Sequence, residues 1–97
     1  MKLPELTHLS YAVLKTVKNS KKHGRKIRLF LEETISHETS LAAFYQLMSR
    51  LKKIGVINGN YCIRVVDGQT IKERVYRITP SGIRMIRETE RFYKQFF

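Results

Sequence analysis

The segment from residue 40 to residue 54, SLAAFYQLMSRLKKI, carries side chains that could bind DNA bases and phosphates. Gln, Ser, Arg and Lys donate hydrogen bonds to base edges and phosphate oxygens, and alanines let a helix backbone approach a groove closely. At 100° per residue, these residues fall on one side of a helix and most apolar residues fall on the other. The candidate DNA contacts are Ser40, Ala42, Ala43, Gln46, Ser49, Arg50 and Lys53. An ordinary solvated helix face is the alternative interpretation.

A basic segment precedes this helix in the sequence. Residues 15–28 contain repeated Lys and Arg and no acidic residue, and NSKKHG within them is expected to be a loop. Like charges repel one another unless an anion lies near them, and DNA phosphates would relieve that repulsion as counterions are released. The residues that we expect to contact phosphates are Lys21, Lys22, Arg25 and Lys26. A loop that only keeps the protein soluble is the alternative.

A β-hairpin with basic residues is expected between residues 61 and 78. YCIRVV and IKERVYRI are rich in β-branched and aromatic residues, and the Asp67-Gly68 pair between them indicates a tight turn. The alternation of side chains along a strand places Lys72 and Arg74 on the same face. The candidate DNA contacts of this hairpin are Arg64, Lys72 and Arg74, which could reach a minor groove or a phosphate. An ordinary exposed hairpin is the alternative.

Catalytic and metal chemistry are poorly supported by the residues present. His8, His23 and His37 lack metal-ligand spacing, and Cys62 has no second cysteine to pair with. Asp67 is the only aspartate and has a structural reason to lie in a turn. No pair of carboxylates is spaced to act as acid and base. We therefore expect no enzyme activity, no metal and no cofactor.

The composition is that of a small basic protein. The 97 residues include 19 Lys and Arg against 8 Asp and Glu, and the resulting net charge of +11 indicates an anionic partner. No apolar run approaches the ~20 residues of a membrane span, so we expect no membrane association. A single cysteine and the absence of a signal-peptide pattern suit a cytosolic protein.

Helical periodicity and capping residues predict the elements that position these side chains. Thr7 and Ser40 are expected N-caps, Gly55 ends the third helix, and Thr79-Pro80 begins the last helix. The predicted helices span about 7–18, 24–34, 40–54 and 79–97, and the predicted strands span 61–66 and 71–78. The residues predicted to face the core are Ile27, Phe30 and Leu31 in the second helix and Leu41, Phe44, Tyr45, Leu47, Met48, Leu51 and Ile54 in the third.

The order of these elements predicts an α+β, mostly helical fold. Three helices followed by a β-hairpin wing and a C-terminal helix correspond to a winged helix-turn-helix, and we expect residues 1–97 to form one such DNA-binding domain. The helix-turn-helix consists of the second and third predicted helices. Its second helix, which is the third helix of this chain (residues 40–54), lies in the major groove of DNA. The wing, residues 61–78, would then lie on the flanking groove or on phosphates.

The last helix has more apolar surface than one small domain can cover. Its apolar residues form two adjacent stripes, and exposed patches of that kind mark an interface. We therefore expect residues 79–97 to form a dimerisation helix. The candidate dimer contacts are Ile86, Phe92, Tyr93, Phe96 and Phe97. The alternative is that the extra aromatic residues pack back on the first helix.

Four segments together resemble the PadR-type winged-helix transcription regulators, as well as small winged-helix proteins of plasmids or archaeal viruses. They are LTHLSYAVL (6–14), HGRKI (23–27), FYQLMSRLKKIGVI (44–57) and VYRITPSG (75–82). The resemblance implies a homodimeric repressor with the third helix as recognition helix and the last helix in the dimer interface. It also implies that Tyr45, Arg50 and Lys53 lie on the recognition helix and that Lys72 and Arg74 lie in the wing.

The expected function is therefore that of a transcriptional regulator that binds double-stranded DNA at specific sequences as a homodimer. The alternative is a protein-interaction or architectural module, or one that binds nucleic acid without sequence preference. Sequence selectivity separates the two, because a regulator should bind its site at least ~1,000-fold more tightly than random duplex DNA. The sequence makes no prediction about a small-molecule effector.

Overall fold

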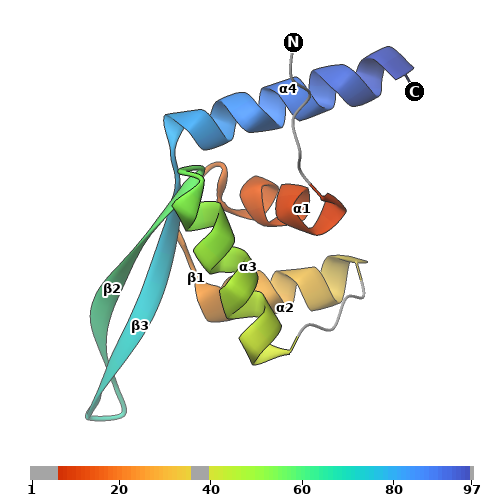
Figure 1. Cartoon of the computed structure of the whole chain (residues 1–97). Coiled ribbons are helices and arrows are strands. Elements are labelled where there is room, and N and C mark those ends of the chain that lie inside the picture. The colour runs from red at the N-terminus through yellow and green to blue at the C-terminus, as the bar shows by residue number, and fades with distance from the viewer. Residues whose placement is uncertain (1–6, 36–39, 97) are drawn as a thin grey trace.

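The computed structural model describes residues 7–35 and 40–96, with four helices and three strands in these ranges (Figure 1). In chain order, the elements are α1 (His8–Val17), β1 (Lys22–His23), α2 (Gly24–Ile35), α3 (Leu41–Lys53), β2 (Ile57–Val66), β3 (Gln69–Ile78) and α4 (Pro80–Phe96). The α+β fold and the winged helix-turn-helix order are confirmed. The helix boundaries differ from the predicted ones by at most one residue.

The helix ends are fixed by the capping residues that the sequence indicates. Thr7 Oγ1 accepts a hydrogen bond of 3.0 Å from the Ser10 N–H, and Ser40 Oγ accepts one of 3.1 Å from the Ala43 N–H. After α3 the chain turns at Gly55, whose φ of 84° is favourable for glycine. The hydroxyl of Thr79 caps α4 and also donates to the Gly55 carbonyl, which ties the start of α4 to the end of α3.

The strands form one antiparallel sheet in the order β1-β3-β2. The turn between β2 and β3 consists of Asp67 and Gly68, both at positive φ (51° and 76°), as a type I′ hairpin requires. This turn joins Val66 directly to Gln69, so β3 begins two residues earlier than predicted. At its other end, β2 begins at Ile57, four residues earlier than predicted. The strand β1 is a correction, because we expected its residues to be a loop. A strand of two residues has no alternating pattern, and pairing with β3 creates it.

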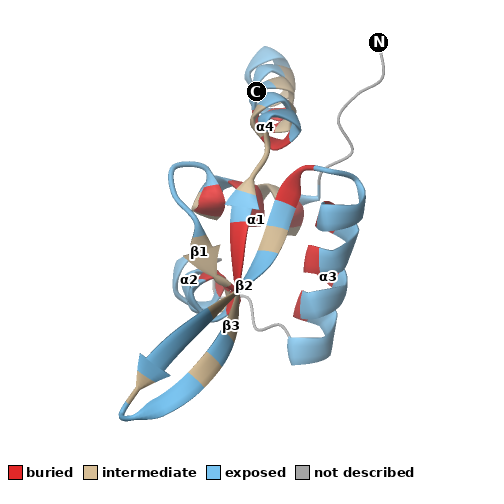
Figure 2. Cartoon of the chain, turned by 90° about the vertical axis from the view of Figure 1, so that its left-hand side faces the viewer, coloured by how far each residue is buried: buried red, intermediate tan, exposed pale blue. Residues whose placement is uncertain are grey.

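The core lies where α1, α2 and α3 meet the base of the sheet (Figure 2). In α3 only the stripe formed by Phe44, Leu47, Met48 and Leu51 is buried. Three residues predicted to face the core, Leu41, Tyr45 and Ile54, are exposed, and in α2 Phe30 is exposed as well. The reason is that α3 contacts the domain along one narrow side, and residues that flank this side remain in solvent.

The last helix begins in close contact with the segment that follows α3. A Cβ atom on Gly82 would lie 2.2 Å from the carbonyl oxygen of Val56, so only glycine fits there. From this point α4 runs over α1 (Figure 1). Ile86 is completely buried in the common core, and Lys15 of α1 lies 3.6 Å from Glu90 of α4.

Candidate nucleic-acid interface

The outer side of α3 is an exposed polar face. All seven candidate contacts from the sequence are exposed, on the side away from the buried stripe of Phe44 to Leu51 (Figure 2). They are Ser40, Ala42, Ala43, Gln46, Ser49, Arg50 and Lys53. Ser40 also caps the helix. The structure thus brings these residues together on one surface that holds hydrogen-bond donors and positive charge and has no acidic side chain of α3 on it.

The basic segment lies at the start of α2. Arg25 and Lys26 are exposed in its first turn, Lys21 is exposed just before β1, and half-buried Lys22 lies in β1 with its ammonium on the Ser20 hydroxyl. The positive end of a helix dipole is an unfavourable place for cations and a favourable place for a phosphate. The first turn of α2 has no acidic residue of its own, and the carboxylate at this end of the helix is that of Glu73 from β3, which contacts His23.

The wing has two faces with different electrostatics. Tyr61 pairs with Arg74 and Ile63 pairs with Lys72 across the hairpin, so these side chains share one face, which we call the inner face. Arg64 lies on the other face, the outer face, where its Nη2 donates to Glu73 Oε1 at 2.8 Å. The predicted wing contacts are therefore split. Lys72 and Arg74 lie together on the inner face, whereas Arg64 is hydrogen-bonded to the Glu73 carboxylate on the outer face.

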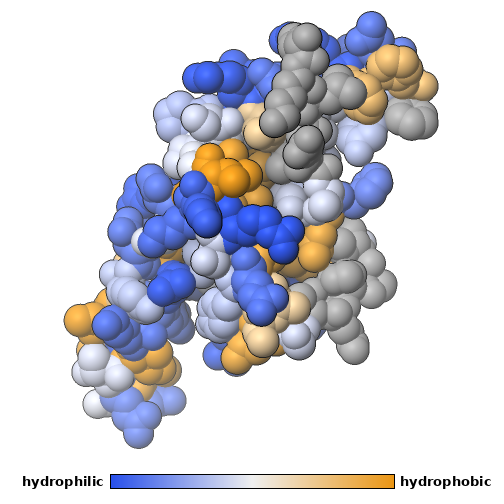
Figure 3. Space-filling model, in the orientation of Figure 1, coloured by the Kyte–Doolittle hydropathy of each residue, from blue (hydrophilic) through white to orange (hydrophobic). Residues whose placement is uncertain are grey.

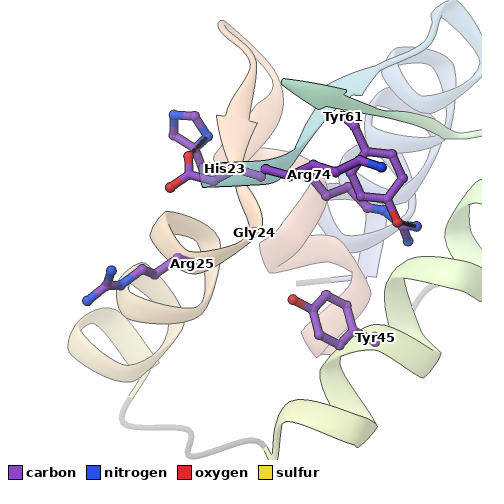
Figure 4. A pocket seen from close by; sticks show the side chains of 8 residues that line it. His23, Gly24, Arg25, Tyr45, Tyr61 and Arg74 are labelled. Carbon is purple, nitrogen blue, oxygen red and sulfur yellow. Dashed lines mark hydrogen bonds and ion pairs between the residues drawn. The ribbon is translucent and has the colours of Figure 1, made fainter. Parts of the chain in front are cut away.

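A hollow of about 470 Å³ opens between the wing, the start of α2 and α3 (Figure 4). Tyr45 enters it from α3, and Tyr61 and Arg74 come from the sheet on the opposite side. The remaining lining residues are His23, Gly24, Arg25, Lys72 and Glu73. Sequence reasoning did not identify this site. Helical periodicity placed Tyr45 in the core, only the family resemblance placed it on the recognition helix, and Tyr61 carried no signal beyond its aromatic character.

Arg74 is held by neutral aromatic side chains rather than by a carboxylate. Its Nη2 donates to the Tyr61 hydroxyl at 2.6 Å, and its guanidinium carbon lies 4.8 Å from the centre of the Tyr61 ring. The hydroxyls of Tyr76 and then Tyr61 raise the pKa of Arg74 above its ordinary value. Lys72 Nζ lies 4.3 Å from the same Tyr61 ring. Two cations thus gather on one aromatic side chain.

Some residues of the apolar stripes of α4 pack against the rest of the domain. Ile86 is completely buried in this domain, which corrects its expected place in a dimer interface, and Tyr93 stacks on His8 of α1 at 6.2 Å. Phe92 and Phe96 contact each other, with ring centres 4.9 Å apart, and Phe96 is 65% exposed. Figure 3 shows hydrophobic surface at this end of α4. Phe97 lies outside the described residues.

Other kinds of site are not seen in the described ranges. No group of His, Cys, Asp or Glu there is arranged to hold a metal ion. None of the helices described has both the length and the hydrophobicity that crossing a bilayer requires.

Comparisons with known proteins identify one family. The model of the PadR-like family of transcriptional regulators matches residues 13–88. A PadR family transcription regulator from Clostridium difficile has a similar structure, with a TM-score of 0.79 and 13% identity over 93% of this chain and 91% of that one. A putative transcriptional regulator from Thermoplasma acidophilum gives a TM-score of 0.77 and 20% identity over 90% and 81%.

One structural neighbour was solved with nucleic acid. Bacillus subtilis PadR in complex with operator DNA has a TM-score of 0.70 and 19% identity, over 84% of this chain and 45% of that one. The present chain therefore corresponds to less than half of that regulator. No curated protein matches the chain in sequence.

Proposed function

Because the chain belongs to the PadR-like family of transcriptional regulators, we propose that it binds double-stranded DNA at specific sequences, as a homodimer. The observation that supports this most directly is the exposed polar face of α3, which stands beside a wing with two cations on its inner face. The operator complex of Bacillus subtilis PadR supports the same class of partner.

In this proposal α3 enters the major groove. Its alanines allow close approach at the N-terminal end, and Gln46 and Arg50 lie one turn apart on the exposed face, where they can reach base edges. Arg is suited to guanine and Gln to adenine, because each pairs with two atoms of the base edge. Ser49 and Lys53 are placed for phosphate or base contacts on the same side.

The basic segment supplies contacts that do not depend on sequence. Lys21, Arg25 and Lys26 are exposed and would bind phosphates at the start of α2, where the helix dipole adds to their attraction. Lys22 is half-buried, so we expect it to contribute least. Their role is to fix the position of the domain on the duplex, since phosphates carry no sequence information directly.

The homodimer would form through α4. Phe92 and Phe96 leave aromatic surface at the C-terminal end of the helix, and a two-fold pair of helices would cover it on both chains with the same patch. Two recognition helices would then lie about one DNA turn apart, roughly 34 Å, as an inverted repeat requires.

Selection of bound fragments from random duplex DNA tests the proposal. We expect a palindromic motif that the protein binds at least ~1,000-fold more tightly than random duplex at the same salt concentration. Binding that is equally tight for all fragments would contradict it and would support the alternative of an architectural protein. A variant with Gln46→Ala and Arg50→Ala is the matched control, because it should bind DNA and fail to enrich the motif.

A further inference from the structure

The hollow between α3 and the wing lies where a DNA strand would have to pass. If α3 occupies the major groove and the wing reaches the adjacent minor groove, the strand that separates these two grooves must lie between the two elements. That space is the hollow lined by Tyr45 on one side and by Tyr61 and Arg74 on the other (Figure 4).

Resting on the proposed function, we infer that this hollow is the seat of one backbone phosphate, bound by Arg74 together with the hydroxyls of Tyr45 and Tyr61. The contacts assigned to α3 and to the basic segment do not include it. It would be the point at which the wing and the recognition helix hold the same strand.

The state of Arg74 fits a phosphate ligand. A guanidinium has five N–H donors, and the 2.6 Å hydrogen bond to the Tyr61 hydroxyl uses one of them. Because that partner is neutral, the charge of Arg74 is not cancelled, and the Tyr61 ring restricts where the side chain can lie. Less conformational freedom is then lost when a phosphate binds.

Arg64, on the other face of the same hairpin, differs from Arg74 because its charge is paired with a carboxylate. Its guanidinium donates to Glu73 at 2.8 Å, and the other oxygen of that carboxylate lies 2.9 Å from Nδ1 of His23. The Glu73 carboxylate, which also lines the hollow, is thus hydrogen-bonded to Arg64 and lies beside His23. The inner face keeps the unpaired positive charges of Lys72 and Arg74.

The two tyrosines complete the seat from both sides. A phenol hydroxyl donates one hydrogen bond and is a common partner of phosphate oxygens in protein–DNA complexes. Tyr45 is half-exposed on α3, and Tyr61 is exposed on β2. When the Tyr61 hydroxyl accepts from Arg74, its own hydrogen remains available for a phosphate oxygen.

The first experiment compares Arg74→Gln with Arg64→Gln, which each remove one positive charge from the same hairpin. Binding to random-sequence duplex DNA is measured at several salt concentrations. Arg74→Gln should reduce the slope of log affinity against log salt by close to one unit, and Arg64→Gln should leave it unchanged. Equal slopes for Arg74→Gln and the wild type would overturn the inference.

The second experiment separates charge from orientation. Arg74→Lys keeps the charge and Tyr61→Phe keeps the ring, so both should preserve the salt slope while lowering affinity about fivefold, the effect of one lost hydrogen bond. Circular dichroism confirms that each variant is folded. Wild-type affinity in both variants would show that the tyrosine does not position the arginine at a phosphate.

The third experiment locates the phosphate. Duplexes that carry the selected site are made with one neutral methylphosphonate at a time. One position should weaken the wild type and Arg64→Gln strongly and Arg74→Gln clearly less, because the arginine contact to that phosphate is already missing and only the tyrosine contacts remain to be lost. Equal sensitivity of both variants at every position would overturn the assignment of Arg74.

These outcomes are distinguishable from failure of the proposed function. If the salt slope falls in Arg74→Gln and selection yields no motif, the phosphate site is supported and sequence-specific regulation is contradicted. If selection yields a clear motif and the salt slope of Arg74→Gln is unchanged, sequence-specific binding is supported and the phosphate site is contradicted.

Discussion

The helices α3 and α4 give one side to the same core and differ in what their other side exposes. On α3 the exposed side is polar and cationic, with Gln46, Arg50 and Lys53 in solvent. On α4 it includes the aromatic pair of Phe92 and Phe96. Because both helices bury one side in this core, burial does not account for the difference between their exposed sides. We interpret the first as a surface for DNA and the second as a surface for a second copy of the chain.

The largest expected effect comes from removing the aromatic surface of α4. Phe92→Glu with Phe96→Glu places like charges in the proposed two-fold contact and should give a folded monomer. A monomer binds only one half-site, so specific affinity should fall by about 10²–10⁴-fold, the usual range of bivalent enhancement. Light scattering at micromolar concentration, together with a titration of the selected site, measures both effects.

The wild-type mass provides the check on that prediction. A mass near 11.5 kDa, that of one chain, would show that the dimer claim is wrong and that α4 differs from α3 for another reason. Lys94→Glu with Gln95→Glu is the matched control, since it adds acidic residues to the same turn of α4 without changing Phe92 or Phe96.

A second effect should be seen at the start of α2. Replacement of Lys21, Lys22 and Lys26 by Gln should weaken binding to all DNA sequences alike and lower the salt slope by close to one unit per lost phosphate contact. Because Lys22 is half-buried in β1, its single variant should change the slope least. An unchanged slope in the triple variant would mean that this segment does not touch phosphates.

A third prediction tests whether the exposed face of α3 reads bases. Gln46→Ala and Arg50→Ala should each reduce discrimination between the selected site and random DNA, by ~1–3 kcal/mol for a contact that pairs with two base atoms. The fold should be intact, because both side chains are exposed and the buried stripe is untouched. An unchanged ratio of specific to random affinity in both variants would exclude α3 as the reading helix.

Local signals in the sequence were sufficient for the helices and for the turn of the wing. Phe44, Leu47, Met48 and Leu51 recur at helical spacing, and Asp67-Gly68 is one of the few pairs that adopt positive φ readily, so these elements follow from short-range chemistry. The exposed positions of α3 then follow from the buried ones.

Features that depend on contacts between distant segments could not be predicted. The strand β1 exists because Lys22 lies beside Tyr76 of β3. The different environments of Arg64 and Arg74 depend on the register of the hairpin, which sets Arg74 opposite Tyr61. The hollow requires α3 and the wing to be placed relative to each other. A sequence pattern describes one element at a time and does not contain that placement.

The smallest expected effect concerns the caps of the two helices. The Ser40 hydroxyl makes one bond, of 3.1 Å, to the Ala43 N–H. The Thr79 hydroxyl makes two, since it accepts from the Gly82 N–H at 3.1 Å and donates to the Gly55 carbonyl at 2.6 Å. Loss of a cap costs about 0.5–2 kcal/mol. We expect Ser40→Ala to fall near the lower end of that range and Thr79→Ala near the upper end.

Urea unfolding of Ser40→Ala and Thr79→Ala, with Thr79→Ser as the control that keeps the hydroxyl, measures the difference in free energy of unfolding. We expect the larger loss at Thr79 because its hydroxyl also links the end of α3 to the start of α4. Equal losses for the two alanine variants would mean that the link to Gly55 adds no stability. The relative placement of α3 and α4 would then rest on Gly82, where α4 meets Val56, and on the burial of Ile86.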